Sequence, residues 1–253
     1  MRAFERQTDL LMLDFDGVIT QSIDECLVSG HNAYADYRGG SRVERIADLD
    51  REWVDTARYL RSFIRNGEDY VYIAHALASG EKVNDQDDFD AFKQSNIDLK
   101  DTFFDRFVQA RHSFARSRPE QWCELSPLYP GMAGFLKDYE PGNNLYIITT
   151  KLLVFVREIL SFHNIDLQQE NLFDTRDGRS KSQIITDILA NRQISKKQCY
   201  FLDDQVDTVI KVYPTGIHAI LALWGYNNPE QVETARSRNI ETMTRQAFFQ
   251  FFA

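Results

Sequence analysis

The sequence predicts an α/β protein in which helices cover both faces of a parallel β-sheet, with a block of helices inserted after the first strand. From about residue 127 onward, short apolar runs alternate with helical patterns, which is typical of parallel sheets wrapped on both sides. Residues 22 to about 125 contain no convincing strand, and their aromatic residues recur at helical spacings. We therefore expect a Rossmann-like core domain of residues 1–21 and 126–253 and an all-α domain of residues 22–125.

The composition narrows the classes of protein to consider. The chain has 253 residues, of which 43% are hydrophobic and 26% charged, enough for a sizeable core. Its net charge of −9 argues against a broad nucleic-acid or anionic-lipid interface, because such binding rests on clustered Lys and Arg. We find no signal peptide and no run near the ~20 apolar residues that span a membrane, so we expect a soluble, cytoplasmic protein. Its cysteines, Cys26, Cys123 and Cys199, are widely spaced and predict neither a disulfide framework nor a metal motif.

The first predicted strand, Leu10–Phe15, ends in two carboxylates. In "LLMLDFDGVIT", Asp14 and Asp16 lie two residues apart, and in an extended segment such residues point to the same side. A carboxylate at a strand end can attack phosphorus and form an acyl phosphate, while a second can protonate the leaving oxygen and later accept a proton from water. Two adjacent negative charges need a positive partner nearby, which the rest of the sequence should supply.

The inserted block carries aromatic residues at helical spacings, as in "EWVDTARYLRSFI" and "DTFFDRFVQARHSFARSR". We interpret them as the core of a helical bundle rather than as a surface that stacks on a substrate. The stretch Arg65–Tyr70 forms a turn between two predicted helices. Arg65 could bind a second anionic group of a substrate, although an ordinary surface arginine is the simpler interpretation.

A helix is predicted at Met132–Tyr139, and a strand follows it at Leu145–Thr149. Two polar residues at the end of this strand are candidates for binding phosphate. Thr149 ends this strand and offers a hydroxyl and a backbone N–H to a phosphate group. Lys151 lies two residues further on, where the next helix begins. We interpret Lys151 as a solvated lysine at a helix start, with a contact to phosphate as the alternative.

A positive partner for the carboxylates is found in "GRSKSQII". Ser180 and Gln183 are typical of a capping box, which places Lys181 in the first helical turn. There its ammonium and the positive end of the helix both favour anionic oxygens. The following strand, Cys199–Leu202, runs into the acidic stretch "DDQVD", whose carboxylates suit Mg²⁺. A last strand is predicted near His218–Leu223.

These strand ends are expected to converge. In open α/β sheets the ligand site lies beyond the carboxyl ends of the strands, and Asp14, Thr149 and Asp203 all lie at such ends. Two neighbouring carboxylates are tolerable there if Mg²⁺ and Lys181 share their charge. The five histidines form no zinc-binding pattern, so we do not expect a zinc site.

The order of these motifs resembles that of the haloacid dehalogenase superfamily. "DFDGVIT" matches the family's first motif, D-x-D-G, and "YIITT" matches the second, a Ser or Thr that closes an apolar strand. "GRSKSQII" matches the third, a Lys that opens a helix, and "FLDDQVD" matches the fourth, an acidic cluster that closes a strand. The resemblance covers residues 9 to about 230 except the helical block.

The resemblance implies a role for each matched residue. Asp14 would be the nucleophile, Asp16 the general acid/base, and Lys181 the clamp that offsets the negative charge. The implied phosphate-binding residues are Gly17, Thr149, Thr150 and Lys181. The implied Mg²⁺ ligands are Asp14, the main-chain carbonyl of Asp16, Asp203 and a second acidic residue of the fourth motif, either Asp204 or Asp207.

The acid at position 16 favours phosphatases and phosphomutases, because dehalogenases of this family lack an acid there. "PLYPG" and "LALWGYNNPE" resemble the phosphoglycolate phosphatase branch. The resemblance thus implies Mg²⁺-dependent hydrolysis of a small phosphomonoester through an aspartyl-phosphate intermediate, with no role for nucleic-acid polymers or membranes. A sugar phosphomutase and a non-catalytic phosphometabolite-binding protein are the alternatives.

The inserted helices resemble the family's α-helical cap, in which Arg65 and Tyr70 are candidates for selecting the substrate. Four residues depart from the branch's usual pattern. Thr150, Leu202 and Gln21 stand where Asn, Gly and Asp are frequent. Asp204 stands where a small residue is common. The identity of the phosphomonoester is therefore left open by the sequence.

Overall fold

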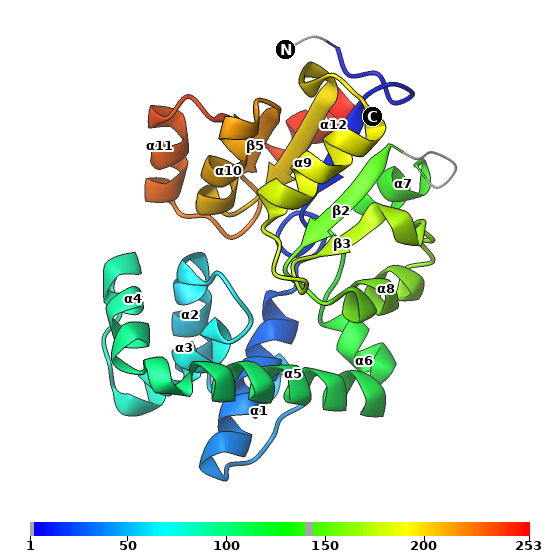
Figure 1. Ribbon diagram of the computed structural model, residues 1–253. Helices are drawn as coiled ribbons and strands as arrows, with labels where there is room; N and C mark the ends of the chain where they lie inside the picture. Colours follow the sequence, from blue (N-terminus) through cyan, green and yellow to red (C-terminus); the bar gives the residue numbers. More distant parts are fainter. Residues whose placement is uncertain (1–2, 140–143) are drawn as a thin grey trace. The chain divides into compact units, whose positions relative to one another are not determined.

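The computed structural model describes residues 3–139 and 144–253, and the chain forms two compact units (Figure 1). The α/β unit comprises Met1–Gln21 and Leu128–Ala253, and the helical unit comprises Ser22–Pro127. The helical unit thus ends at residue 127 rather than at residue 125. Among the described residues, every helix is too short or too polar to cross a lipid bilayer.

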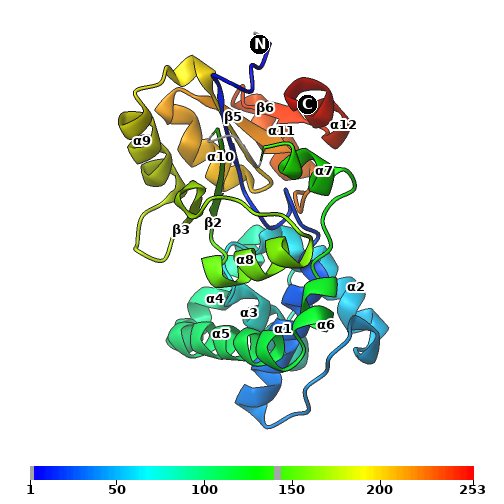
Figure 2. The same cartoon turned by 90° about the vertical axis from the view of Figure 1, so that its right-hand side faces the viewer.

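The α/β unit is built on a parallel sheet that, in the described part of the chain, has six strands in the order β3-β2-β1-β4-β5-β6. The strands are β1 (Leu10–Leu13), β2 (Leu145–Thr149), β3 (Leu172–Asp174), β4 (Cys199–Asp203), β5 (His218–Ala222) and β6 (Glu241–Met243). Figure 2 shows them seen partly edge-on. The predicted Rossmann-like sheet is confirmed, and its strand order reverses between β1 and β4, which is where such sheets bind ligands.

The central strand β1 is shorter than the sequence predicted, because it ends at Leu13 instead of Phe15. The backbone N–H of Asp14 still continues the ladder to the carbonyl oxygen of Leu202 at 2.9 Å. The N–H of Phe15 instead donates to the carboxylate of Asp14 at 2.7 Å. The chain therefore leaves the sheet at Asp14, whose side chain lies at the carboxyl end of β1.

The edge strands β3 and β6 were not predicted. Each has only three residues, and each pairs with one neighbour, β2 or β5. Their sequences, "LFD" and "ETM", are too short to show either an apolar run or an alternation. Their strand conformation follows from a neighbouring edge that offers hydrogen bonds, which a local pattern does not reveal.

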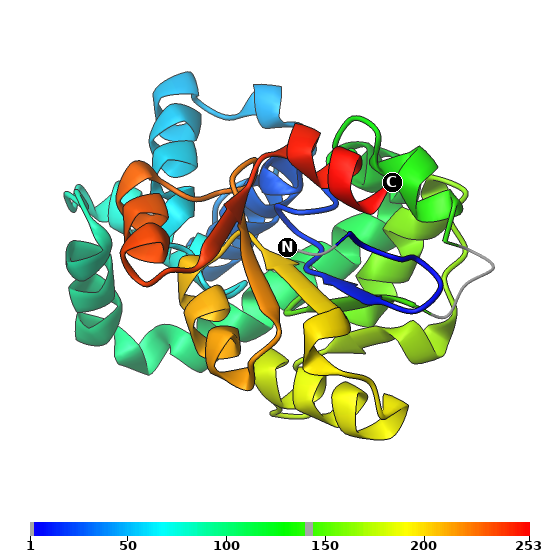
Figure 3. The same ribbon diagram turned by 90° about the horizontal axis from the view of Figure 1, so that it is seen from above.

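Helices cover both faces of the sheet (Figure 3). The helices of this unit are α7 (Met132–Lys137), α8 (Leu153–Phe162), α9 (Lys181–Arg192), α10 (Val206–Val212), α11 (Pro229–Ser237) and α12 (Arg245–Phe252). One face packs against apolar side chains of α9, α10 and α11. On the other, Phe252 of α12 packs edge-on against Tyr200 of β4, and Phe248 packs against Phe135 of α7. Burying each such side chain contributes about 1.5–3 kcal/mol.

The helical unit contains α1 (Ile23–Arg38), α2 (Arg51–Leu60), α3 (Asp69–Ser79), α4 (Gln86–Ser95), α5 (Lys100–Ser117) and α6 (Pro119–Glu124). Helix α1 packs against α3 and α5. Phe103, Phe107 and Phe114 are buried, so the interpretation of the aromatic residues as a bundle core is confirmed for them. Tyr59 and Phe104 are exceptions, since they are 61% and 48% exposed. The hydroxyl of Tyr59 donates to the carbonyl oxygen of Asn84.

Candidate active site

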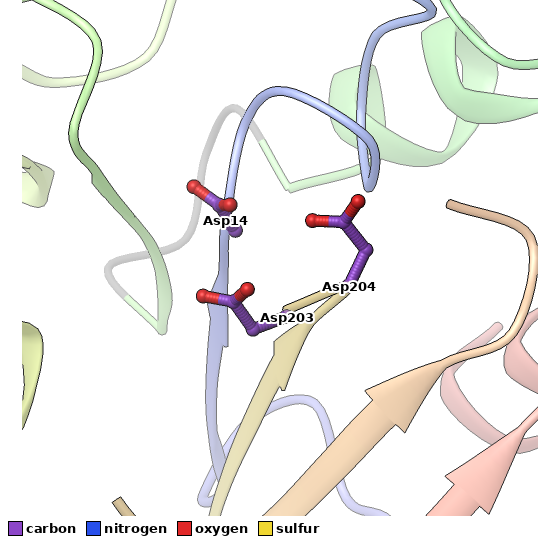
Figure 4. Close-up of side chains that lie close together, drawn as sticks. All are labelled: Asp14, Asp203 and Asp204. Atoms are coloured by element: carbon purple, nitrogen blue, oxygen red, sulfur yellow. The ribbon is translucent and has the colours of Figure 1, made fainter. Parts of the chain in front are cut away.

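Three aspartates meet at the carboxyl edge of the sheet, beside the point where the strand order reverses. Asp14 follows β1, Asp203 ends β4, and Asp204 comes directly after it. Figure 4 shows that the three side chains point into one common space. One carboxylate oxygen from each lies within 4.8 Å of the others, and all three residues are buried. The sequence predicted that Asp14 and Asp203 would meet and left open whether Asp204 or Asp207 would join them, and in the structure Asp204 lies in the cluster.

Lys181 is the positive partner of this cluster. Its Nζ lies 2.8 Å from Oδ1 of Asp14 and 2.8 Å from Oδ2 of Asp203. The capping box predicted for Ser180 and Gln183 is present and starts α9 at Lys181, so the helix start fixes where the ammonium lies. One lysine faces three carboxylates, and the cluster therefore carries an excess of negative charge.

Burial shapes the protonation of these groups. It raises the pKa of Asp14 to about 7, with the ammonium of Lys181 opposing the rise and the carboxylate of Asp203 adding to it. Burial likewise raises the pKa of Asp203, again against the effect of Lys181. Burial alone would lower the pKa of Lys181, but the two carboxylates outweigh it and hold that pKa above its ordinary value. Lys181 therefore stays protonated and pairs with both carboxylates.

The two carboxylate oxygens of Asp14 are in different situations. Oδ1 accepts hydrogen bonds from the backbone N–H of Phe15 and from Lys181. Oδ2 accepts no hydrogen bond from any residue that the structure describes. The side chain is 7% exposed. One oxygen is thus fixed, and the other is available to a ligand or an electrophile.

Asp204 fits closely against two glycines. A Cβ atom on Gly17 would overlap the carboxylate of Asp204, and a Cβ on Gly225 would overlap its Cβ. Gly17 also has a φ of +88°, which strains any other residue. The N–H of Tyr226 donates to Oδ2 of Asp204 at 2.7 Å. Gly17 was predicted as a site residue, whereas Gly225 was not, although it lies in the stretch "LALWGYNNPE".

Asp16 lies in an ion pair that the sequence did not predict. Nζ of Lys151 is 3.3 Å from both Oδ1 and Oδ2 of Asp16, and the hydroxyl of Thr20 donates to Oδ1 at 3.2 Å. The interpretation of Lys151 as a solvated residue is wrong, because its side chain is 0% exposed. The reason is a turn in which the backbone N–H of Lys151 donates to Oγ1 of Thr149 at 3.1 Å.

The remaining candidates lie in several places. Thr149 is buried at the end of β2, and its neighbour Thr150 is exposed. Asp207 is in the first turn of α10 and is not part of the aspartate cluster, so Asp204 is the residue that joins Asp203 beside Asp14.

Arg65 and Tyr70 are engaged within the helical unit. The Arg65 guanidinium donates to the carbonyl oxygens of Ser62 and Ile64 and to Gln86. Tyr70 is buried and stacks on Phe107 at a ring-centroid distance of 5.7 Å. Their role in selecting a substrate stays a prediction.

The donor set suits Mg²⁺. Carboxylate oxygens are hard ligands, and Mg²⁺ commonly takes one or two of them together with waters and phosphate oxygens. Asp14 and Asp204 each bring a carboxylate to the cluster. Asp203 is already engaged at both oxygens, by Lys181 and by the N–H of Gln205. The cluster's negative excess is the property that a divalent cation would offset.

Comparison with known proteins finds likeness in the fold alone. No protein-family model and no curated protein matches the sequence. A haloacid dehalogenase-like family hydrolase from Streptococcus pneumoniae is 14% identical, with a TM-score of 0.56 over 95% of each chain. A predicted phosphoglycolate phosphatase from Haemophilus somnus is 15% identical, with a TM-score of 0.57 over 94% of each chain.

A haloacid dehalogenase family hydrolase from Deinococcus radiodurans, solved with bound phosphate and sodium, is 16% identical with a TM-score of 0.56. The match covers 97% of this chain and 94% of that one. In all three comparisons the structural similarity extends over nearly the full length of both chains. The chain therefore has the fold of the haloacid dehalogenase-like hydrolases.

Proposed function

We propose that this protein is a Mg²⁺-dependent phosphatase that hydrolyses a small phosphomonoester through an aspartyl phosphate on Asp14. The observation that carries the proposal is the unequal state of the two Asp14 oxygens. Oδ1 is held by Phe15 and Lys181, while Oδ2 accepts no hydrogen bond from the described residues. A carboxylate held in this way presents one oxygen as a nucleophile in a fixed direction.

In the first step, Oδ2 of Asp14 attacks the phosphorus atom. A bond forms between that oxygen and phosphorus, and the bond from phosphorus to the leaving oxygen breaks. Asp16 gives its proton to the leaving oxygen, which departs as an alcohol. Lys181 stays paired with Oδ1 of Asp14 and limits the repulsion between this carboxylate and the phosphate dianion.

In the second step, water attacks the phosphorus of the aspartyl phosphate. Asp16 accepts a proton from this water, the bond between phosphorus and Asp14 breaks, and inorganic phosphate leaves. Asp16 is then protonated and Asp14 is again a carboxylate, so the enzyme returns to its starting state. The hydroxyl of Thr149 and the backbone N–H of Thr150 are the donors we expect on the phosphate oxygens. The N–H of Gly17, which the sequence suggested for this role, instead donates to the carbonyl oxygen of Thr20 at 2.9 Å.

The residues that would hold Mg²⁺ are Asp14, Asp204 and the main-chain carbonyl of Asp16, with Asp203 beside them. When bound, the ion supplies positive charge that offsets the carboxylates and the phosphate. The excess of three carboxylates over one lysine supports this part of the proposal. We assign the second acidic ligand to Asp204 rather than Asp207 because Asp204 lies in the cluster.

The helical unit is proposed to serve as the cap domain. The chain enters it after Gln21 and leaves it at Pro127. In the α/β unit, Thr20 forms a bridge with Leu128, and the N–H of Tyr129 donates to the carbonyl oxygen of Ile19 at 3.0 Å. The two connections of the inserted unit thus lie side by side, and the first of them begins a few residues after Asp16.

The experiment is phosphate release across a panel of phosphomonoesters, with Mg²⁺ and then with a chelator. We expect release from at least one small phosphomonoester, its loss in the chelator and its recovery with added Mg²⁺. The exposed Asp187→Asn variant is the matched control for carboxylate removal, and it should behave as wild type. Full activity in the chelator would remove Mg²⁺ from the mechanism, and a requirement for a bisphosphate primer would indicate a mutase instead.

A further inference from the structure

Asp16 is held from two directions by residues that touch neither Asp14 nor Lys181 in the described contacts. Lys151 reaches it from the end of β2, with its Nζ 3.3 Å from each carboxylate oxygen. Thr20 reaches it from the same loop, with its hydroxyl 3.2 Å from Oδ1. Lys151 and Thr20 have no exposed side-chain surface, whereas the side chain of Asp16 is 21% exposed. The carboxylate is therefore supported on its buried side and open on the other.

Two backbone turns build this support. The N–H of Lys151 donates to Oγ1 of Thr149, so the turn that ends β2 also determines where the lysine begins. The N–H of Gly17 donates to the carbonyl oxygen of Thr20 at 2.9 Å, and the N–H of Thr20 donates to that of Phe15 at 3.0 Å. The loop that carries Asp16 is thereby closed on itself, and Thr20 is fixed against the carboxylate.

The pair is costly for a purely structural contact. Removing an ammonium from water costs several kcal/mol, and one ion pair with a partly exposed carboxylate returns only part of it. An apolar side chain of similar length would fill the same buried space without that cost. An apolar residue at this position would lose the ion pair to Asp16.

We propose that Lys151 and Thr20 are positioning residues for Asp16, which hold its carboxylate in the orientation that serves the leaving oxygen. The proposal rests on the proposed phosphatase activity. It predicts that the two residues act only through Asp16 and make no contact with the transferred phosphoryl group. The competing arrangement is that Lys151 binds a phosphate oxygen directly, and the experiment separates the two.

The experiment measures kcat and KM for Lys151→Met and Thr20→Val on an alkyl phosphate and an aryl phosphate. The aryl leaving group needs little protonation, so a misplaced Asp16 should matter less for it. We expect kcat on the alkyl phosphate to fall roughly 10- to 100-fold, as misplaced catalytic groups do, with a smaller loss on the aryl phosphate and little change in KM. Thr20→Ser keeps the hydroxyl and should retain most of the activity, and the exposed Lys197→Met is the matched lysine control.

A double-mutant cycle with Asp16→Asn completes the test. If Lys151 acts through Asp16, then adding Lys151→Met to Asp16→Asn should cause little further loss on either substrate. Equal losses on the alkyl and aryl phosphates, or a full additional loss in the Asp16→Asn background, would overturn the proposal and assign Lys151 to the phosphoryl group.

Failure of the phosphatase function and failure of a variant to fold can both be told apart from failure of the positioning role. A wild-type protein that releases no phosphate even from the aryl substrate would refute the phosphatase function itself, and the positioning role with it. If Lys151→Met fails to fold, the pair Thr20→Val and Thr20→Ser still decides the question, because Thr20→Val keeps the buried volume and loses the hydroxyl, whereas Thr20→Ser keeps the hydroxyl and loses a methyl group. A Thr20→Val enzyme with wild-type kcat on the alkyl phosphate would then contradict the inference.

Discussion

Each unit of the molecule buries a cluster of charged side chains, and the two clusters are built differently. In the helical unit, Glu25 and Arg111 form one negative and one positive partner. In the α/β unit, three aspartates share one lysine. The first cluster is electrically balanced, and the second carries an excess of negative charge.

The hydrogen bonds of Glu25 show what a structural cluster looks like. Arg111 donates to both of its oxygens at 2.9 Å, Ser29 donates to Oε1 at 2.7 Å, and Trp122 donates to the same oxygen at 3.0 Å. The cluster thus joins α1, α5 and α6. A buried carboxylate with this many donors has little capacity left for a ligand.

The contrast separates a stabilising cluster from a candidate reactive one. Both are buried, so burial alone does not mark a site. What differs is the charge balance and the presence of an oxygen, Oδ2 of Asp14, that no described residue occupies. Carboxylates with shifted pKa values in a cluster of unbalanced charge are typical of functional sites. Variants in each cluster should therefore fail in different ways.

The largest expected effect is on activity in the Asp14→Asn variant. An amide cannot attack phosphorus, so phosphate release should fall to background while the protein stays folded. Circular dichroism and a phosphate assay on the same sample check this. More than a few per cent of wild-type activity would rule out the covalent mechanism.

Next in size is the effect of Asp16→Ala. General acid catalysis contributes typically 100- to 10,000-fold, and we expect kcat on an alkyl phosphate to fall by roughly that factor. The loss should be smaller on an aryl phosphate, because its leaving oxygen needs less protonation. The same loss on both substrates would argue against an acid role for Asp16.

In the helical unit the expected effect is on stability. Arg111→Met leaves the buried charge of Glu25 without its partner, which should cost about 3–5 kcal/mol. Denaturant unfolding measures it, and the double variant Glu25→Leu with Arg111→Met should recover much of the loss, since no charge is then buried. An Arg111→Met protein as stable as wild type would show that this cluster is not structural.

The smallest effect concerns pH and the free energy of unfolding in the presence of a chelator. Because the pKa of Asp14 is raised to about 7 when folded, the folded state holds its proton more tightly, and ionising Asp14 destabilises the protein as pH rises. Asp14→Asn removes this penalty. It should be more stable than wild type by at most about 4 kcal/mol at pH 8, with the difference fading toward pH 4. A difference that grows as pH falls would contradict the sign.

Part of this site was predictable because it follows local patterns. The strand Leu145–Thr149 and the capping box at Ser180 are set by neighbouring residues. The meeting of Asp14 and Asp203 follows from the rule that parallel strand ends share one edge. Lys181 was expected as the positive partner because the capping box places it in the first turn of a helix.

Other parts were not predictable because they depend on distant residues. Lys151 is paired with a carboxylate 135 positions away in the sequence, whereas its own neighbours suggest only a helix start. Gly225 is required by the side chain of Asp204, which no local turn pattern reveals. The strands β3 and β6 need an existing sheet edge to form.

The most direct test of the account is to look for the phosphoryl group on Asp14. Wild-type protein is mixed with a phosphomonoester and Mg²⁺, quenched in acid within its first turnovers and digested for mass spectrometry. The account predicts one added phosphoryl group on the peptide that contains Asp14, and no such product in Asp14→Asn. Sustained phosphate release with no phosphorylated peptide, or with the group on another residue, would contradict it.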